Sequence, residues 1–530
     1  MLCVRSALLT ARLGAAAALS LIIALGSVPG TAAAAPTRTT PAHLDTSLLQ
    51  AAASNPSATV RVIITRDRGG DAEGAVNHNG GRVIGKLQLA NATVAEVPAS
   101  RLHELALQPG VARVSVDAPV TLQADPLSTC CADLQTVYPL AVDAASQWDS
   151  SRHLRGTGIG VAVIDSGITP SNPDFRGANL NQHSRIAAFI NEISHSELSG
   201  IDDNGHGTFV SGIIGGRGWG APGVASGSYI GIAPDANLIS LKVSDSTGKA
   251  YVSDVIAAIE WATQHREQYN IRVINLSLVS NTSNLYLFDM LDAAVELAWL
   301  QGIVVVVAAG NAGPNAPITA PANDPFVITV GATDDKGTPS TADDTLASFS
   351  SYGTSFDGVN KPDLVAPGRH IVSTLSSPAS PLALAFPSRI VGNGHYIQLS
   401  GTSAAAPVVS GVVAQVLQAR PNLNPGQVKW LLTHTSQAVA GPGTGAGYPR
   451  VGAAVNYSAP IGTTNTHRLP NLYLLAAYAT KTGVAWNSVA WNDVAWNDVA
   501  WNDVAWNDVA WNDVAWNDVA WNDVAWLPTD

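Results

Sequence analysis

Five apolar segments of strand length lie between residues 147 and 455. In chain order they are IGVAVID, NLISLKV, RVINLSL, GIVVVVAAG and FVITVGA. Helical patterns of apolar residues separate several of them, for example over 253–269 and 288–301. Strands that are apolar on both faces and are joined by helices are typical of a parallel sheet covered on both sides. The pattern therefore predicts an α/β domain over 146–455, with three αβα layers around a mainly parallel central sheet.

A smaller α+β pattern occupies residues 58–120. TVRVIIT, TVAEV and VARVSVD have strand patterns, and ASRLHELALQPG has helical spacing that stops at Pro-Gly. Residues 36–57 are rich in Pro, Thr and Ala and indicate a linker, while residues 121–145 contain few clear elements. We therefore predict two folded units joined by a connecting region.

The first 35 residues have the pattern of a signal peptide. Arg5 and Arg12 give a basic start, residues 13–28 are apolar, and three alanines at 32–34 suit a cleavage site. An uncleaved membrane anchor is the alternative, but the apolar run is short and no charged stop follows it. We therefore expect a secreted, extracellular protein.

The C-terminal region has a composition of its own. After a connector over 456–483, the triplet Val-Ala-Trp occurs nine times between residues 484 and 530, at a spacing of five residues. Five residues match neither the helix period nor the strand period. The repeat leaves two structures open: a solenoid with a corner every five residues, or a flexible array of tryptophans. Because exposed tryptophans bind apolar or planar partners well, we expect a surface or polymer ligand for them.

Composition narrows the classes of partner. The chain has 530 residues, of which 13% are charged, and a net charge of −12, which argues against a nucleic-acid partner. Cys3 belongs to the signal, and Cys130 and Cys131 are adjacent, so they form a strained ring, pair between chains or stay free. No second Cys/His pair lies at zinc-ligand spacing. We expect a monomer that is stabilised by packing or bound ions.

Four polar residues end or follow apolar segments and are candidates for catalysis. Asp165 ends a strand, where active groups collect in parallel sheets, although a helix cap is the plainer alternative. His206 lies between two glycines at a predicted helix start; a metal site is disfavoured because no second histidine lies one turn away. Asn311 ends a central strand and either makes a turn or donates an N–H to an oxyanion. Ser403 lies in SGTSAAAP, either as a packing residue or as a nucleophile.

The order of these residues selects one kind of chemistry. A serine needs a base to lose its proton, and an imidazole base needs a carboxylate to hold its tautomer. The order Asp165, His206, Ser403 differs from that of α/β-hydrolases and of chymotrypsin-type enzymes, and no G-x-S-x-G motif is present, which excludes a lipase of that fold.

The segments VIDSG, NGHGT, AAGNAG and SGTSAAAP, in this order, resemble the signature blocks of subtilisin-like serine proteases. GIAPDANLISLKV, INLSL and KPDLVAPG are further matches, so that the resemblance extends over about 145–440. It implies a serine endopeptidase with Asp165, His206 and Ser403 as the triad and Asn311 as the oxyanion donor. No cofactor is implied for catalysis, and structural calcium, frequent in the family, cannot be assigned to residues.

The resemblance also implies how peptides bind and how the enzyme matures. Protein or peptide substrates lie along two strands, which assigns substrate binding to Gly248, Ala250, Ser277 and Val279. The family usually has Gly-Gly where this chain has Val279 and Ser280, so specificity does not carry over. The unit at 58–120 resembles the family's inhibitory propeptide, a ferredoxin-like fold, and its removal by self-processing is expected within about 118–138.

Two remaining expectations concern alternatives and local geometry. A protein that binds only through its repeats, and an acid-active enzyme that uses Glu and Asp, are alternatives; His206 and Asn311 disfavour the second. We expect Ser403 to begin a helix, with small residues around it for access of the substrate backbone. Pro407 is expected within the first turn of this helix, where a missing N–H costs nothing.

Overall fold

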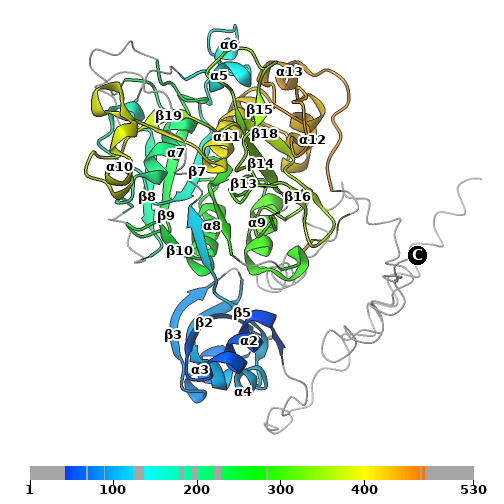
Figure 1. Cartoon of the computed structure of the whole chain (residues 1–530). Helices are drawn as coiled ribbons and strands as arrows, with labels where there is room; N and C mark the ends of the chain where they lie inside the picture. Colours follow the sequence, from blue (N-terminus) through cyan, green and yellow to red (C-terminus); the bar gives the residue numbers. More distant parts are fainter. Residues whose placement is uncertain are drawn as a thin grey trace, which may run out of the picture.

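The computed structural model describes most of the two predicted units. The described residues are 42–66, 70–88, 90–122, 136–177, 184–193, 200–219, 228–281, 284–314, 316–465, 468 and 470–471. The predicted signal peptide, Cys130, Cys131, most of the linker after the large unit and the tryptophan repeats lie outside the described residues. We call residues 42–118 the small domain and residues 136–465 the large domain (Figure 1).

The large domain is built on an eight-stranded sheet. Its order is β15-β14-β13-β11-β7-β9-β8, with β18 also paired to β14, and only the β14–β15 pair is antiparallel. These strands are β7 (Gly160–Asp165), β8 (Ile186–Asn191), β9 (Asn237–Lys242), β11 (Ile271–Leu276), β13 (Val304–Ala308), β14 (Ile328–Asp334), β15 (Thr345–Leu346) and β18 (Leu364–Pro367). Every residue of β7, β13 and β14 is buried, as their unbroken apolar sequences require.

Helices form a layer on each side of this sheet. They are α5 (Tyr138–Ala141), α6 (Ala145–Trp148), α7 (His206–Gly215), α8 (Val252–Gln264), α9 (Met290–Leu300), α10 (Pro381–Ala385), α11 (Thr402–Ala419), α12 (Pro425–His434) and α13 (Val451–Asn456). In Figure 1, α8 and α9 lie on the side of the sheet that faces the small domain, and α7 and α11 lie on the other side. The predicted α/β architecture with a mainly parallel sheet is therefore confirmed.

The short elements of the large domain lie around this core. They are β10 (Lys249–Tyr251), β12 (Leu278–Ser280), β16 (Gly353–Thr354), β17 (Asn360–Lys361), β19 (Ile371–Thr374), β20 (Ile390–Val391), β21 (Tyr396–Leu399) and the 3-10 turns η2 (Pro173–Phe175), η4 (Tyr286–Phe288), η5 (Pro387–Arg389) and η6 (Gly392–Gly394). Strands β16 and β17 pair with each other, and β19, β21 and β20 form a second small sheet.

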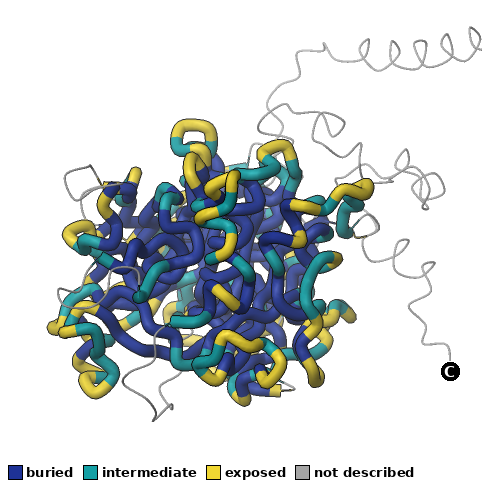
Figure 2. The backbone as a smooth tube through the Cα atoms, turned by 90° about the horizontal axis from the view of Figure 1, so that it is seen from above, coloured by how far each residue is buried: buried dark blue, intermediate teal, exposed yellow. Residues whose placement is uncertain are grey.

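Helix α11 is the centre of the large domain. It is long and apolar enough to cross a membrane by length and composition alone, yet nearly all of it is buried inside the protein. It packs against α7 and against four strands of the sheet, namely β11, β13, β14 and β18. Figure 2 shows the same continuous buried interior, with exposed residues confined to outer turns. The apolar character of α11 therefore serves the core of a globular domain.

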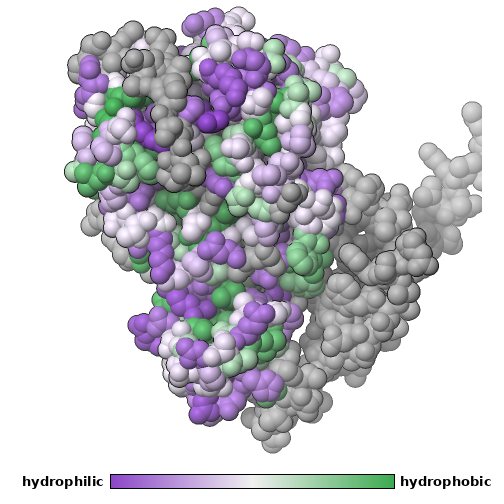
Figure 3. Space-filling model, in the orientation of Figure 1, coloured by the Kyte–Doolittle hydropathy of each residue, from purple (hydrophilic) through white to green (hydrophobic). Residues whose placement is uncertain are grey.

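The small domain is a five-stranded sheet with helices. Its elements are β1 (His43–Leu44), α2 (Thr46–Ser54), β2 (Thr59–Arg66), α3 (Ala72–His78), β3 (Arg82–Leu87), β4 (Ala92–Pro98), η1 (Ala99–Arg101), α4 (Leu102–Ala106) and β5 (Val111–Val116). The sheet order is β1-β5-β2-β4-β3, and only β1 and β5 are parallel. Figure 3 shows polar and apolar residues intermixed over both domains on the face in view.

The prediction of a linker over 36–57 is wrong for its described part. Strand β1 and helix α2 belong to the small domain, where Ala42 and Leu48 are buried in its core. Asp45 forms a buried ion pair with Arg113, whose Nη2 lies 2.7 Å from the carboxylate. The sequence did not predict α2, because a nine-residue helix buries few apolar positions and these give only a weak helical pattern within an Ala- and Pro-rich segment.

A further strand, β6 (Pro119–Leu122), leaves the small domain and enters the large one. It lies antiparallel between β10 and β12, and the three form a sheet of their own (Figure 1). The sequence predicted few elements near these residues, because β6 is a strand only through partners more than 120 residues further along the chain.

Candidate active site

Asp165 and His206 lie together at the carboxyl end of the central strand β7. The Nδ1 atom of His206 is 2.8 Å from Oδ1 of Asp165, and both side chains are almost fully buried. The same carboxylate oxygen accepts a hydrogen bond from the backbone N–H of Ser166. With Asp165 as its acceptor, Nδ1 carries the proton and Nε2 is left as the basic nitrogen. The imidazole is therefore in the tautomer that a general base requires.

A buried carboxylate, Asp202, holds the start of the helix that carries His206. It accepts hydrogen bonds from the backbone N–H groups of Asn204, Gly205 and Thr208, at 2.7–3.1 Å, and from the hydroxyl of Ser166 at 2.8 Å. Burial raises the pKa of Asp202, and these hydrogen bonds act in the opposite direction. Sequence reasoning assigned Asp202 no role, although an acidic residue before a helix start is a known capping signal.

The two glycines beside His206 are required by the local packing and backbone conformation. A Cβ at position 207 would lie 2.2 Å from the carbonyl oxygen of Gly167, so Gly207 permits α7 to approach the end of β7. Gly205 precedes the helix with φ of 113°, a conformation that favours glycine. Both glycines therefore fix the distance between Asp165 and His206.

Ser403 is the second residue of α11 and is buried, with a relative exposure of 1%. Its neighbour Thr402 donates its backbone N–H and its hydroxyl to Oδ1 of Asn311, both at 2.9 Å. The same hydroxyl accepts from the backbone N–H of Gly310 at 3.1 Å. These contacts fix the amide of Asn311 beside the start of α11 with its Nδ2 end as a donor, which is the arrangement an oxyanion site needs.

The expectation for Pro407 is wrong in detail. Pro407 is the sixth residue of α11, beyond the first turn. An N–H at this position would bond to the carbonyl of Ser403 in a regular helix. The carbonyl of Ser403, the nucleophile candidate, therefore lacks the N–H that would donate to it in a regular helix.

The triad is not closed in this state. Within the described residues, Nε2 of His206 is buried and has no hydrogen-bond partner, so the structure contains no bond from this atom to Ser403. Hydrogen bonds of this kind are often long in the absence of substrate. The structure thus brings Asp165 to His206 and Asn311 to the start of α11, and leaves the proton-transfer contact to form with substrate.

The four predicted substrate residues lie in or directly beside β10 and β12, the two strands that flank β6. Ala250 lies in β10 opposite Val120, and Val279 lies in β12 opposite Thr121. Ser277 comes directly before β12, and its hydroxyl donates to the carbonyl of Ser403 at 3.0 Å. Gly248 lies in the turn before β10, with φ of 81°. The strand β6 therefore occupies the place between two backbones that was predicted for a peptide substrate.

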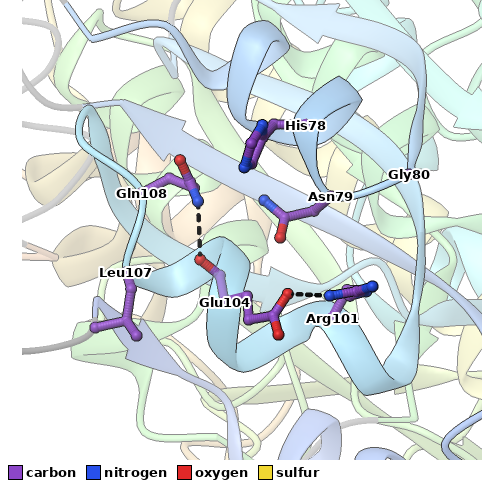
Figure 4. A pocket seen from close by; sticks show the side chains of 7 residues that line it. All are labelled: His78, Asn79, Gly80, Arg101, Glu104, Leu107 and Gln108. Carbon is purple, nitrogen blue, oxygen red and sulfur yellow. Dashed lines mark hydrogen bonds and ion pairs between the residues drawn. The ribbon is translucent and has the colours of Figure 1, made fainter.

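A separate hollow lies on the small domain, away from these residues. It has a volume of about 480 Å³ and is lined by His78, Asn79, Gly80, Arg101, Glu104, Leu107 and Gln108 (Figure 4). Glu104 pairs with Arg101, and its carbonyl accepts from Nε2 of Gln108 at 3.5 Å. Because all of its lining residues belong to the small domain, this hollow adds nothing to the catalytic arrangement.

Comparison with known proteins places this geometry in a family. The sequence pattern of the Subtilase family matches residues 156–454, more than half of the chain. The chain belongs to this family. The matched region contains Asp165, His206, Asn311 and Ser403. The resemblance inferred from the four signature blocks is therefore confirmed at the level of the family.

Individual subtilase relatives differ in how much of them this chain covers. Serine protease AprX of Bacillus subtilis (strain 168) is 42% identical over 285 residues, which are 53% of this chain and 61% of the relative. The thermostable alkaline protease of Halalkalibacterium halodurans is 33% identical over 349 residues, 66% of this chain and 78% of the relative. The structure of fervidolysin from Fervidobacterium pennivorans, a keratinolytic enzyme related to subtilisin, matches with a TM-score of 0.59 and 26% identity, over 77% of this chain and 62% of that one. The chain thus spans about three fifths of AprX and of fervidolysin.

Within the described ranges, no group of three or more His, Cys, Asp or Glu side chains is arranged to hold a metal ion. Two ammonium groups instead lie against a partly buried carboxylate, that of Asp363. Nζ of Lys429 donates to the carbonyls of Pro325 and Val327 at 2.8 and 2.7 Å and contacts Asp363 at 2.8 Å. Nζ of Lys361 contacts the same carboxylate at 2.8 Å. The predicted structural calcium remains an untested expectation.

Proposed function

We propose that this protein is a secreted serine endopeptidase that hydrolyses peptide bonds through an acyl-enzyme on Ser403. The observation that carries the proposal is the buried Asp165–His206 pair at the end of β7, with Nδ1 and Oδ1 2.8 Å apart. A carboxylate in this position stabilises the imidazolium that forms when Nε2 accepts a proton. Membership of the Subtilase family supports the same activity.

The chemistry follows from these atoms. Oγ of Ser403 attacks the substrate carbonyl while Nε2 of His206 takes its proton. The oxygen of the carbonyl becomes negative, and Nδ2 of Asn311 and backbone N–H groups at the start of α11 donate to it. The proton then passes from His206 to the leaving amine, and the acyl group remains on Ser403. A water molecule, deprotonated by His206, releases the acid product and restores the hydroxyl.

The protein is made as a precursor in which the small domain inhibits the large one. The position of β6 between β10 and β12 supports this proposal, because the strand takes the backbone hydrogen bonds that a substrate would take. The order βαββαβ with neighbours β5-β2-β4-β3 supports the ferredoxin-like architecture predicted for the inhibitor. Strand β6 runs to Leu122, inside the range of about 118–138 in which we expect the cut, and a cut soon after that residue is compatible with its pairing.

Two carboxylates join the domains through backbone donors. Asp117 of the small domain accepts from the N–H and the hydroxyl of Ser253, at the start of α8, both at 2.9 Å. Glu260 of the large domain accepts from the N–H groups of Gln88 and Ala90, both at 3.0 Å. These contacts hold the small domain beside the groove independently of β6 and support its role as an inhibitor.

The test of self-processing is the mass of the secreted full chain carrying Ser403→Ala, made in a host without other proteases. An intramolecular cut should not occur without the attacking oxygen, so the variant should keep residues 42–118 covalently attached. Ser240→Ala is a matched control, because Ser240 is also a buried serine whose hydroxyl donates to a carbonyl, that of Gly200, at 3.0 Å. The control should be processed like the wild type. Processing of Ser403→Ala at the wild-type bond would disprove self-activation.

The activity itself is tested by a serine-specific fluorophosphonate. The wild-type protein should be labelled on Ser403, as shown by peptide mapping. A protein that works only through its tryptophan repeats would remain unlabelled.

The repeats are proposed to retain the enzyme on a surface or polymer. Deletion of residues 484–530 should leave hydrolysis of small peptides unchanged, because these residues follow the matched region 156–454. The same deletion should reduce retention on a polymer such as insoluble protein or cellulose. Failure of the truncated protein to fold would show that the repeats contribute to the stability of the large domain.

A further inference from the structure

Ser403, the nucleophile candidate, lies in a turn of α11 that lacks one backbone hydrogen bond of a regular helix. In a regular α-helix the carbonyl of residue 403 accepts from the N–H of residue 407. Here residue 407 is proline, which has no N–H, and it lies inside α11. A buried carbonyl that loses its helical partner needs another donor, since a buried acceptor without a hydrogen bond destabilises the fold.

That donor is the hydroxyl of Ser277, which lies 3.0 Å from the carbonyl oxygen of Ser403. Ser277 has a relative exposure of 0%. Its residue links β11 to β12, the strand that pairs with β6. One side chain therefore joins the backbone of Ser403 to the backbone that faces the peptide.

Two more buried residues fix the direction of this hydroxyl. Nδ2 of Asn275 donates to Oγ of Ser277 at 3.0 Å, so the serine oxygen acts as an acceptor there and as a donor toward Ser403. Oδ1 of Asn275 accepts from the hydroxyl of Ser410 at 2.8 Å. All of them are fully buried. We call Ser410, Asn275 and Ser277 the polar chain.

The polar chain contacts α11 at two points on one face. Ser403 and Ser410 are seven residues apart, which is close to two helical turns. Asn275 is at the carboxyl end of β11, next to β7 and its terminal Asp165. The start of α11 is thus fastened to the same sheet that carries the carboxylate of the triad, through hydrogen bonds rather than apolar contact alone.

We propose that the hydroxyl of Ser277 replaces the helix bond lost at Pro407 and thereby positions Ser403 relative to the peptide groove. Ser277 is a positioning residue, and Asn275 and Ser410 orient its hydroxyl. The proposal rests on the proposed function, in which Ser403 is the nucleophile. It adds a role for the Ser277 side chain that is separate from any contact of its backbone with substrate.

The physical consequence is a change in turnover rather than in binding. Without the Ser277 donor, the first turn of α11 is free to shift, and a displacement of about 1 Å at a reacting atom can cost a factor of about 10² in rate. The strands β10 and β12 bind through their backbones and keep their geometry. The effect should therefore fall on kcat and leave KM nearly unchanged.

The experiment compares three variants: Ser277→Ala, Ser277→Thr, and a double variant that combines Ser277→Ala with Pro407→Ala. All are made as the full chain, and each is brought to the processed form with a trace of wild-type enzyme. Two readouts are measured: kcat and KM on a small peptide, and the rate of fluorophosphonate labelling of Ser403. Ser277→Ala should lower kcat and the labelling rate together by a factor of about 10 to 10², with KM changed less than about twofold. Ser277→Thr keeps a hydroxyl and should restore most of the rate.

The double variant is the decisive arm. Pro407→Ala supplies the N–H that α11 lacks, so it should recover a part of the rate lost in Ser277→Ala, although it does not restore the serine. The matched control Ser240→Ala removes another buried hydroxyl-to-carbonyl bond of the same length and should leave both readouts unchanged.

The outcomes separate this proposal from the proposed function. A raised KM with an unchanged labelling rate in Ser277→Ala would assign Ser277 to substrate binding alone and overturn the positioning role. A loss equal to that of the Ser240→Ala control, or a double variant no faster than Ser277→Ala, would also overturn it. If wild-type Ser403 is not labelled at all, the proposed function fails first, whatever the variants do.

Discussion

The two helices that carry catalytic candidates begin in different ways. Helix α7, which starts at His206, has the carboxylate of Asp202 at its beginning, where it accepts from the N–H of Gly205 just before the helix and of Thr208, the third helical residue. Helix α11 starts after Gly401, which has no side chain, and its first N–H is bound by the neutral amide of Asn311. A helix start carries a partial positive charge that attracts anions. The protein fills this site with its own anion at α7 and with a neutral group at α11.

The difference suits the two tasks. At α7 the helix must hold the imidazole in place, and an internal carboxylate accepts one of the free N–H groups, that of Thr208. At α11 a negative charge develops on the substrate during the reaction, and a permanent carboxylate there would oppose it. An amide binds the same donors without a charge. The contrast shows that the kind of residue at a helix start depends on which group must approach that helix end.

The strongest test of this contrast is a change at Asn311. Asn311→Ala removes the donor and should lower kcat by a factor of ~10²–10³ with little change in KM. Asn311→Asp keeps the shape but adds a charge, so at neutral pH it should lose at least as much. Steady-state kinetics on a peptide measures both. An unchanged kcat in Asn311→Ala would remove this residue from the oxyanion site.

Acidification should lower activity through His206, the first residue of α7. Only neutral His206 can accept the serine proton, so kcat/KM should be lower in acid than at neutral pH. Circular dichroism at each pH serves as the control for unfolding. Full activity at pH about 4 would support the alternative enzyme that uses carboxylates, and would be incompatible with His206 as the base.

A change at Asp202 should act on stability. Asp202→Asn replaces one acceptor oxygen by a donor and should lower the free energy of unfolding by about 1–3 kcal/mol, measured by urea denaturation. Because burial raises the pKa of Asp202, the folded state holds this proton more tightly than the unfolded state. The stability that Asp202 contributes is therefore present at low pH and is lost as the pH rises through the raised pKa. A difference between wild type and variant that grows with pH would contradict this.

The smallest expected effect concerns a third helix start. Helix α8 has the carboxylate of Asp117, from the small domain, at the N–H of its second residue, Ser253. Asp117→Ala should weaken inhibition by the small domain by about 1 kcal/mol, the usual cost of replacing a capping residue by alanine. The inhibition constant of the separated wild-type and variant domains, measured on the mature enzyme, gives this difference. An equal inhibition constant would show that Asp117 serves only the fold of the small domain.

Sequence reasoning succeeded where the pattern is local. The strand ending at Asp165 is apolar throughout, and β7 is buried throughout, so both the strand and its polar end were predictable. The order of Asp165, His206 and Ser403 indicated the chemistry, although the distance of 2.8 Å between the first two required the structure. Helix α8 was predicted to end at residue 269 and ends at Gln264.

It failed where a role depends on residues far away in the chain. The segment β6 is a strand because it pairs with β10 and β12. Its four residues are too few to show a strand pattern of polar and apolar positions. Helix α3 and strand β3 were not predicted, because their residues mix glycine with charged and apolar types. Pro407 was placed in the wrong turn: it is the sixth residue of a helix that starts at Thr402, one residue before the expected start at Ser403. The donor that compensates for it, Ser277, lies 126 residues away from Ser403.

The strand β6 also has a consequence for the time course of activation. If the chain is cut soon after Leu122, as the proposed maturation requires, the backbone of β6 is still paired on both sides, with β10 and with β12. The cleaved segment is then a product that is still bound, and every new substrate competes with it for the backbone hydrogen bonds of β10 and β12. The onset of proteolysis is then governed by a dissociation rate rather than by the cutting step, and a culture would contain nicked, silent enzyme before it contains active enzyme. Conditions that loosen two short strands, such as dilution or digestion of the released domain by the first free molecules, would end that delay abruptly.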